Sequence, residues 1–372
     1  MKFQIPAKEF ANAIAAAGKV IESRNNIPIL SNIAIEARDD SIVLRSTDLD
    51  IEYSIAVAAS VIEPGATTIP AKLSGDISKK VSGDVTFALS EGAQQATLSA
   101  GRSRFQLMTL PVSDYPTLTA GEFPHSFTLT GDSLHSALSS VEFAISTEET
   151  RYYLNGVFMH FHADGTPDGK MRFVATDGHR LARMEITAPS RSEGMSGVII
   201  PRKTVKEAVS IASAAKGGDV RIDVSDTKIR FTSGDTVLTS KIIDGTFPDY
   251  QRVIPTDGNI FARVDSKSLI AAADRVSTIS TERGRAVKLG FTAGSLSLQA
   301  SSPDAGSAED VIDVDFDADD MEIGLNAKYA ATALSTIGDG NIRMQLKDAG
   351  SPVLLRREDN DNLLIVIMPM RV

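Results

Sequence analysis

A strand-to-helix unit recurs three times along the 372-residue chain, and this repetition constrains the fold more than any other sequence feature. The copies span residues 3–20, 127–141 and 261–276. In each, a short alternating run precedes apolar residues at i, i+3, i+4 and i+7, the spacing of a helix with one buried face. These helical positions are Phe10, Ala13, Ile14 and Ala17, then Leu134, Ala137, Leu138 and Val141, then Leu269, Ala272, Ala273 and Val276.

A second strand-to-helix unit lies inside each copy. It begins at Ile69–Lys72, at Ile200–Lys203 and at Leu325–Lys328. The first of these predicts a helix less strongly, because Gly75 inside it costs about 1 kcal/mol relative to alanine. Strand-like runs bounded by Gly, Asp and Ser lie between the units, at Ile42–Leu44, Arg172–Val174 and Gly290–Gln299.

The copies start about 124 and 134 residues apart, a spacing typical of domains rather than solenoid repeats. Turn-rich, polar stretches at Gly121–Pro124 and Pro255–Asn259 mark the borders. We therefore predict an α+β fold with three similar domains, 1–122, 123–254 and 255–372, each holding two helices that cover a sheet. Three unrelated domains with ordinary amphipathic helices are the alternative. The shared register of two separate elements in each third disfavours it.

Composition excludes several classes of protein. No stretch approaches the about 20 apolar residues of a membrane span, and the first residues lack a signal-peptide core. A soluble, cytoplasmic protein is expected. The chain has no cysteine, so disulfides, thiolate nucleophiles and cysteine-ligated zinc are unavailable.

Charge is unevenly distributed. The chain carries a formal net charge of −10, which by itself argues against nucleic acid. The predicted helical segments taken together are nevertheless net positive, so the acidic excess lies in the rest of the chain. A basic helical surface within an acidic shell suits a protein that surrounds DNA without adhering elsewhere. A general preference of Lys and Arg for helices explains the count equally well.

Specific motifs resemble the bacterial DNA sliding clamp family, the beta subunit of DNA polymerase III. They lie in all three thirds of the chain: EPGATTIPAK at Glu63–Lys72, GRSRF at Gly101–Phe105, RYYLNG at Arg151–Gly156, ATDGHRLA at Ala175–Ala182, IPRK at Ile200–Lys203, DGTFPDYQRVIP at Asp244–Pro255, MEIGLN at Met321–Asn326 and MPMRV at Met368–Val372. The resemblance therefore covers the whole sequence.

The resemblance implies a non-catalytic processivity factor without a cofactor. Two three-domain subunits would form a head-to-tail homodimer, a six-domain ring with helices lining the hole. The ring would encircle duplex DNA, slide on it without reading sequence, and be opened by an ATP-driven clamp loader. It would tether the replicative polymerase and other replication or repair proteins, because a hydrophobic groove binds their short peptide motifs.

The resemblance also implies which residues form that groove. Met368 and Met370 suit it because methionine is flexible and repacks around different apolar anchors. A buried strand is the alternative for the C-terminal run, and both can hold if one face packs inward. The predicted groove comprises Leu154, Thr176, Gly178, His179, Arg180, Leu181, Pro248, Arg252, Val253, Asn326, Tyr329, Val353, Val366, Ile367, Met368, Pro369, Met370 and Arg371.

Two further sets of residues are expected to contact DNA and to form the subunit interface. Diffuse contacts with phosphate are expected from Arg24, Lys72, Lys79, Lys80, Arg202, Lys203 and Lys206, although each also reads as an ordinary solvated charge. Glu148 and Glu149, just before Arg151, should weaken phosphate contact nearby. The subunit interface is expected to join opposite charges around an apolar contact, and it comprises Arg102, Arg104, Phe105, Ile279, Asp304, Glu309 and Asp310.

The sequence supports an enzymatic function less well than a sliding clamp. His160 and His162 alternate along a strand, but no third metal ligand is identifiable. The series Asp313, Asp315, Asp317 and Asp319 lacks the glycine and glutamate of a calcium loop and favours a strand with one acidic face. No GxxxxGK[ST] phosphate loop is present. A hydrolase using Asp177 and His179 is the alternative function. A monomeric peptide-binding scaffold, which would lack ring closure, is another.

Overall fold

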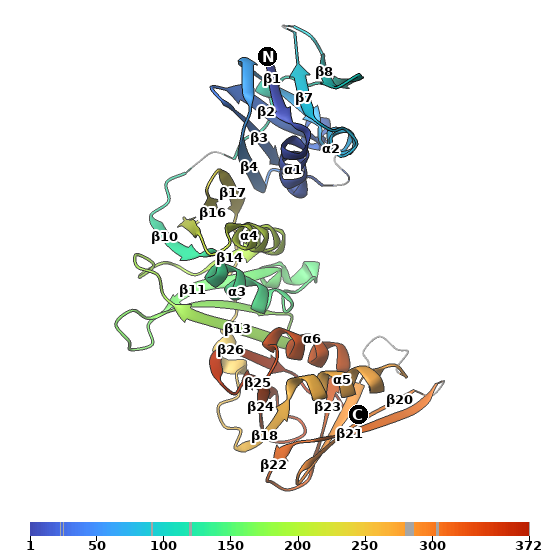
Figure 1. Cartoon of the computed structure of the whole chain (residues 1–372). Helices are drawn as coiled ribbons and strands as arrows, with labels where there is room; N and C mark the ends of the chain where they lie inside the picture. Colours follow the sequence, from blue (N-terminus) through green and yellow to red (C-terminus); the bar gives the residue numbers. More distant parts are fainter. Residues whose placement is uncertain are drawn as a thin grey trace. The chain divides into compact units, whose positions relative to one another are not determined.

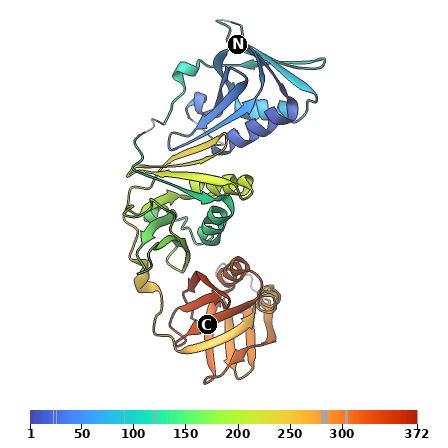
Figure 2. The same cartoon turned by 60° about the vertical axis from the view of Figure 1, so that its left-hand side comes forward.

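The computed structural model describes residues 1–22, 24, 26–90, 92–118, 121–279, 286–302 and 305–371. Its contacts group the chain into two units. Unit 1 comprises Met1–His135 and Lys206–Ile242, and unit 2 comprises Ser136–Val205 and Ile243–Val372. Helices and antiparallel strands build both units, as Figures 1 and 2 show. The mixed composition confirms the predicted α+β class.

All six predicted helices are present, each directly after a strand. The pairs are β1 (Lys2–Pro6) with α1 (Ala7–Ala17), β6 (Gly65–Pro70) with α2 (Ala71–Ser78), β10 (His125–Thr130) with α3 (Gly131–Glu142), β14 (Val198–Pro201) with α4 (Arg202–Ala215), β18 (Ile260–Asp265) with α5 (Ser266–Ser277), and β23 (Met321–Asn326) with α6 (Ala327–Ile337). The threefold repetition of two strand-to-helix units is therefore confirmed. Helix α2 continues through Gly75.

Unit 1 contains two sheets. A five-stranded sheet has the order β5-β1-β7-β8-β9, with β5 (Ser60–Glu63), β7 (Asp84–Ala88), β8 (Gln95–Ala100) and β9 (Ser103–Met108). An eight-stranded sheet has the order β10-β15-β16-β17-β4-β3-β2-β6, with β2 (Asn32–Arg38), β3 (Ser41–Thr47), β4 (Ile51–Ala58), β15 (Asp219–Val224), β16 (Lys228–Ser233) and β17 (Thr236–Lys241). Pairing of β17 with β4 carries this sheet across an expected domain border.

Unit 2 is built in the same way. A nine-stranded sheet has the order β14-β11-β12-β13-β26-β25-β24-β18-β22, with β11 (Gly156–His162), β12 (Lys170–Thr176), β13 (Arg180–Thr187), β22 (Asp315–Phe316), β24 (Asn341–Leu346), β25 (Val353–Arg357) and β26 (Asn360–Ile367). A four-stranded sheet has the order β21-β20-β19-β23, with β19 (Ala286–Thr292), β20 (Ser295–Ser302) and β21 (Gly306–Asp313). Pairing of β13 with β26 crosses the other expected border.

Short 3-10 helices punctuate the connections: η1 (Gly18–Val20), η2 (Pro28–Ser31), η3 (Val112–Asp114), η4 (Glu149–Leu154) and η5 (Tyr250–Val253). Within the part of the chain that the structure describes, no helix is long and apolar enough to cross a membrane.

Helix pairs pack against the sheets to form the cores. In unit 1, α1 contacts α2 as well as strands β3 and β4 of one sheet and β1 and β7 of the other. The rings of Phe3 and Phe87 stack with centroids 5.1 Å apart, and Phe10 meets Phe3 edge-on at 6.0 Å. All three side chains are fully buried. The apolar faces read from the sequence thus meet at this aromatic cluster.

Replacing Phe87 with alanine should lower the free energy of unfolding by about 3–5 kcal/mol, because the change removes a buried ring and leaves a cavity. Urea unfolding followed by circular dichroism measures the effect. The matched control is Phe261→Ala, since that ring is 44% exposed on β18 and its loss should change stability by no more than about 0.5 kcal/mol. Equal effects of the two substitutions would contradict the assignment of the core.

Two strand predictions are wrong in detail. The run Gly290–Gln299 is a hairpin, because β19 and β20 pair antiparallel around a turn in which Gly294 has φ +76°. The acidic series around Val314 was predicted as one strand but divides between β21 and β22, which belong to different sheets. Val314 and Phe316 are buried while Asp313 and Asp315 are exposed, so the predicted alternation of faces is correct.

Candidate functional site

All predicted groove residues lie in unit 2. They come from the end of η4, the turn between β12 and β13, the η5 segment, the start of α6, and the C-terminal residues after β26. Sheet pairing brings two of these parts together, since Arg180 lies opposite Ile367 and Leu181 opposite Val366. Val353 also lies opposite Ile367, on β25.

The turn between β12 and β13 is held by its own side chains. Asp177 accepts hydrogen bonds from the backbone amides of His179 at 2.9 Å and Arg180 at 3.0 Å. Thr176 donates its hydroxyl hydrogen to the Arg180 carbonyl at 2.8 Å and accepts the Gly178 amide at 3.1 Å. Gly178 has φ +86°, and a Cβ there would lie 2.6 Å from Nη1 of Arg151. The positive φ of the turn therefore favours glycine, and a larger residue would also displace the end of the Arg151 side chain.

Arg180 links this turn to helix α6. Its guanidinium lies 4.4 Å from the ring centroid of Tyr329 and 5.1 Å from that of Phe143, and its Nε is 3.0 Å from Asp177 Oδ2. The His179 ring also stacks on Tyr329 at 6.3 Å. These contacts fix the Tyr329 ring beside the turn. Phe143 was not predicted, because nothing in its local sequence points to this cluster.

Backbone hydrogen bonds position the C-terminal residues. The amide of Met368 donates to the His179 carbonyl at 2.8 Å, and the amide of Met370 donates to the Gly324 carbonyl at 2.8 Å. Asn326 caps α6 by accepting the amides of Lys328 at 3.0 Å and Tyr329 at 3.2 Å. The C-terminal segment is thereby attached to both the turn and the strand that precedes α6.

The predicted groove residues divide by exposure. Five apolar side chains are nearly inaccessible and form a supporting layer: Leu154, Leu181, Val353, Val366 and Ile367. Val253 is 49% and Met368 40% exposed, an unusual degree for large apolar side chains. Gly178, His179, Pro248, Arg252 and Arg371 are also exposed. The predicted groove residues thus combine exposed apolar and polar side chains with buried apolar ones.

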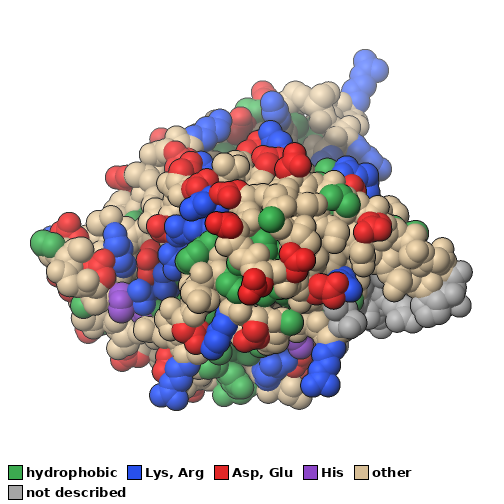
Figure 3. All heavy atoms as spheres, turned by 90° about the horizontal axis from the view of Figure 1, so that it is seen from below, with side chains coloured by type: hydrophobic (Ala, Val, Ile, Leu, Met, Phe, Trp, Pro, Cys, Tyr) green, Lys and Arg blue, Asp and Glu red, His purple; other side chains and the backbone are tan. Residues whose placement is uncertain are grey.

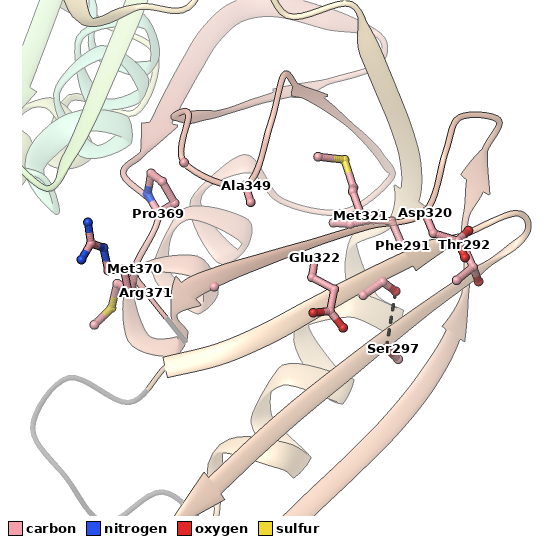
Figure 4. A pocket seen from close by; sticks show the side chains of 13 residues that line it. Phe291, Thr292, Ser297, Asp320, Met321, Glu322, Ala349, Pro369, Met370 and Arg371 are labelled. Carbon is pink, nitrogen blue, oxygen red and sulfur yellow. Dashed lines mark hydrogen bonds between the residues drawn. The ribbon is translucent and has the colours of Figure 1, made fainter.

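A hollow of about 1050 Å³ adjoins the C-terminal residues. Strands β19, β20 and β23, the turn at 349–350 and residues Pro369, Met370 and Arg371 line it. Figure 4 shows Pro369, Met370 and Arg371 on one side, and Thr292 and Asp320 on the opposite side. The face of the molecule drawn in Figure 3 carries interspersed acidic and basic side chains. Only the three C-terminal residues belong to the predicted groove.

Glu148 is engaged by a neighbouring cation. Its carboxylate lies 2.6 Å from Nη2 of Arg151 and accepts the Nε hydrogen at 2.8 Å. This hydrogen bond with Arg151 lowers the pKa of the Glu148 carboxyl. The Glu148 carboxylate is thus paired with Arg151. The neighbouring residue in the sequence, Glu149, is exposed. Their expected weakening of phosphate contact stays a prediction.

The predicted phosphate-binding residues lie on or next to helices. Lys72 and Lys79 line a hollow of about 470 Å³ between α1 and α2, whose wall also includes Glu22 and Asp76. Arg24, Lys72, Lys79, Lys80, Arg202 and Lys206 are exposed, and Lys203 is half-buried on α4. Their exposure permits contact with phosphate.

The predicted interface residues concentrate on two sheet edges. Arg104 and Phe105 lie on β9 with Arg102 in the preceding turn, and Glu309 and Asp310 lie on β21. Asp310 already binds Arg275 at 2.6 Å, and Glu309 accepts the Gln299 amide at 2.9 Å. Ile279 is half-buried after α5, and Asp304 lies outside the described residues.

Within the described residues, the side chains named in the enzymatic alternatives make other contacts. Asp177 binds backbone amides and Arg180, and no hydrogen bond to the His179 ring is found among the described residues. Nε2 of His160 forms a hydrogen bond with the Tyr250 hydroxyl at 3.0 Å. Across the ranges given above, no group of three or more His, Asp or Glu side chains could hold a metal ion.

Comparisons with known proteins cover the whole chain. Three family models match: the N-terminal domain of the DNA polymerase III beta subunit over residues 1–119, its central domain over 128–249, and its C-terminal domain over 251–371. The chain is 39% identical to the beta sliding clamp of Caulobacter vibrioides strain NA1000 / CB15N and 33% identical to that of Escherichia coli strain K12. Each alignment covers 100% of this chain and 100% of the relative.

Solved structures agree with these sequence matches. A DnaN sliding clamp from Bartonella birtlesii bound to griselimycin superimposes with a TM-score of 0.96 at 42% identity. The pol III beta structure from Caulobacter crescentus gives a TM-score of 0.94 at 39% identity. Each comparison covers 100% of both chains.

Proposed function

The chain belongs to the DNA polymerase III beta subunit family, the bacterial sliding clamps, and from this premise we propose that two copies close head to tail into a ring around duplex DNA. Sliding clamps are processivity factors of DNA polymerase III, so the protein is a replication clamp and not an enzyme. The recognised motifs thus identified the family correctly. The proposal concerns ring closure, the contacts with DNA, and the partners.

The observation that carries ring closure is a pair of exposed edge strands. Among the described residues, β9 pairs only with β8, and β21 pairs only with β20. Each edge exposes a large apolar side chain, Met108 at 56% and Val311 at 57%. Such edges invite pairing with another strand unless they are covered. Because β9 and β21 differ in sequence, pairing between copies is heterologous and closes a ring when the rotation allows it.

Charge supports the same pairing. The β9 edge carries Arg102 and Arg104, while the β21 edge carries Glu309 and Asp310. Opposite charges at the rim favour the head-to-tail orientation and oppose pairing of like edges. Domain limits of 1–122, 123–254 and 255–372 would place three domains in each subunit and six in the ring.

Exposed cations on the helices would attract phosphate without reading bases. Such contacts are sequence-independent and weaken with salt, which suits a ring that slides. Retention then depends on topology rather than on affinity. An ATP-driven clamp loader would open the ring, and the site of action would be the cytoplasm.

The patch around Val253 and Met368 would bind short peptide motifs of the replicative polymerase and of other replication and repair proteins. Each buried Leu or Phe anchor contributes about 1.5–3 kcal/mol before ordering costs, which gives an exchangeable complex. Griselimycin, the ligand of the Bartonella birtlesii clamp, is expected to compete with such peptides on this chain.

Light scattering after size exclusion tests ring closure directly. A dilution series at low micromolar concentration should give a molar mass of about twice 39.6 kDa. The protein loaded on circular DNA should be retained through a gel-filtration column and released when the DNA is linearised. A persistent monomer would overturn ring closure and favour a monomeric peptide-binding scaffold.

A further inference from the structure

A row of polar side chains crosses one face of the nine-stranded sheet in unit 2. His160 on β11 lies directly opposite Arg172 on β12, and Arg172 lies directly opposite Glu185 on β13. Residues directly opposite each other in antiparallel strands project from the same face. Arg172 is 8% exposed, and its Nε lies 2.5 Å from Glu185 Oε1. The row is therefore a largely buried polar network beneath a cover.

The cover is the segment that ends in η5. The Phe247 ring stacks on Phe158 with centroids 4.9 Å apart and planes 6° from parallel. Three residues later, the Tyr250 hydroxyl lies 3.0 Å from His160 Nε2 and 3.3 Å from Arg172 Nη1. Phe247 and Tyr250 are 8% and 5% exposed. Two aromatic side chains thus attach this segment to the sheet.

The same segment carries part of the proposed peptide-binding patch. Pro248, Arg252 and Val253 are exposed, while Phe247 and Tyr250 in the same segment are buried. Arg252 pairs only with Asp249 of its own turn among the ion pairs of the described residues, at 2.8 Å. The position of Val253 therefore depends on how Phe247 and Tyr250 are held.

The hydrogen bonds define which atom donates and which accepts when His160 is neutral. Nδ1 of His160 lies 3.0 Å from the Phe161 carbonyl oxygen, which can only accept, so Nδ1 carries the hydrogen. Nε2 then accepts the hydroxyl hydrogen of Tyr250. The Tyr250 oxygen in turn accepts a hydrogen from Arg172. In this series of hydrogen bonds among Phe161, His160, Tyr250 and Arg172, each donor has one acceptor.

Protonation of His160 breaks this assignment. Nε2 would become a donor toward an oxygen that already accepts from Arg172, and the Tyr250 hydrogen would lose its acceptor. The charged and titratable groups around the ring are His162 on β11, Arg172 on β12, Arg183 and Glu185 on β13, and Tyr250 on η5. Glu185 is shared between two guanidinium groups, at 2.5 Å from Arg172 and 3.4 Å from Arg183.

The electrostatic surroundings agree with this geometry. Burial, with further contributions from Arg172 and His162, lowers the pKa of the His160 imidazole below its ordinary value. The folded arrangement thus favours the neutral ring. His160 binds a proton more weakly in this arrangement than when its ring is displaced. The arrangement is therefore retained at neutral pH and is progressively lost as the pH falls below the ordinary pKa of histidine.

We propose that His160 is a positioning residue for the peptide-binding patch and that its protonation releases Tyr250, so that peptide affinity falls in mildly acidic solution. This inference rests on the proposed function. His160 does not touch the ligand, and it acts through Tyr250 on Val253.

The test is a pH titration of peptide affinity on the full-length protein. A fluorescein-labelled peptide with Leu and Phe anchors is the probe, and anisotropy gives its Kd between about pH 7.5 and about pH 5.5. Wild-type protein should bind about fivefold more weakly at the acidic end. His160→Gln should keep the neutral-pH affinity, because a side-chain amide also accepts from Tyr250, and should abolish the pH dependence.

Two variants separate His160 from other histidines. His162→Gln, two residues along the same strand, should retain the pH dependence, and so should His179→Gln, in which the exposed histidine of the patch is replaced. Tyr250→Phe should lower affinity at neutral pH and remove most of the pH dependence. A wild-type Kd that does not change with pH, or a pH dependence that survives His160→Gln, would overturn the proposal.

Hydrogen exchange supplies a readout that needs no peptide. Amides of residues 247–253 should exchange faster at about pH 5.5 in the wild type than in His160→Gln at the same pH. If the wild type binds no peptide at neutral pH but the difference in exchange is still observed, the proposed peptide-binding function is contradicted and the role of His160 is not. Equal exchange in the two proteins would reject the role of His160 as a positioning residue.

Discussion

Replacing Val311 with aspartate is expected to convert the dimer into monomers. Val311 lies on β21, the edge strand of the four-stranded sheet among the described residues, is 57% exposed, and shares its strand with Glu309, Asp310 and Asp313. The substitution removes an apolar contact and adds a fourth carboxylate to a strand that must approach another strand. Loss of a central interface contact costs about 2 kcal/mol or more, which weakens association about thirtyfold. Light scattering at low micromolar concentration should then report one subunit.

The matched control is Phe261→Asp. Phe261 is also a large apolar side chain on a strand of unit 2, 44% exposed, but β18 is paired on both sides. This variant should remain dimeric and stay on circular DNA, whereas Val311→Asp should be released. A Val311→Asp protein that kept the dimer mass after dilution would show that β21 is not the subunit interface.

Deleting residues 368–372 is expected to abolish peptide binding while leaving the ring intact. The deletion removes the exposed Met368 side chain, which is 40% accessible, and the backbone bonds to His179 and Gly324. Strand β26 ends at Ile367, so its pairing with β13 and β25 is retained. Affinity for the Leu- and Phe-containing peptide should fall by more than about thirtyfold. Isothermal titration calorimetry measures the loss.

The internal controls for this deletion are dimer mass and retention on circular DNA, both expected to be unchanged. A second control is Arg371→Ala, which keeps Met368 and both backbone bonds and should have a much smaller effect. Undiminished peptide binding by the shortened chain would exclude the C-terminal residues from the site. Loss of binding together with loss of the dimer would instead indicate a general disturbance of unit 2.

The candidate site was only partly predictable from the sequence. Gly178, His179, Pro248, Val253 and Met368 are proposed on the basis of the family motifs. The supporting contacts were not, since Phe143 lies against Arg180, and Tyr250 against His160, only because strands and turns distant in sequence meet. Sequence spacing alone offered one usable signal, the pair of aromatic residues three positions apart around Pro248.

The sequence by itself determined the six strand-to-helix units, the α+β class and the membership of the clamp family. These depend on local periodicity and on motifs, which can be read without knowing what packs on what. Tertiary structure alone decided three things. It joined β4 to β17 and β13 to β26 across the expected domain borders, and it divided the acidic run at Val314 between two sheets. It also distinguished the buried Leu181 and Val366 from the exposed Val253 and Met368. The physical reason is that strand pairing and burial depend on partners more than a hundred residues away, whereas helix periodicity depends only on neighbours within about two turns.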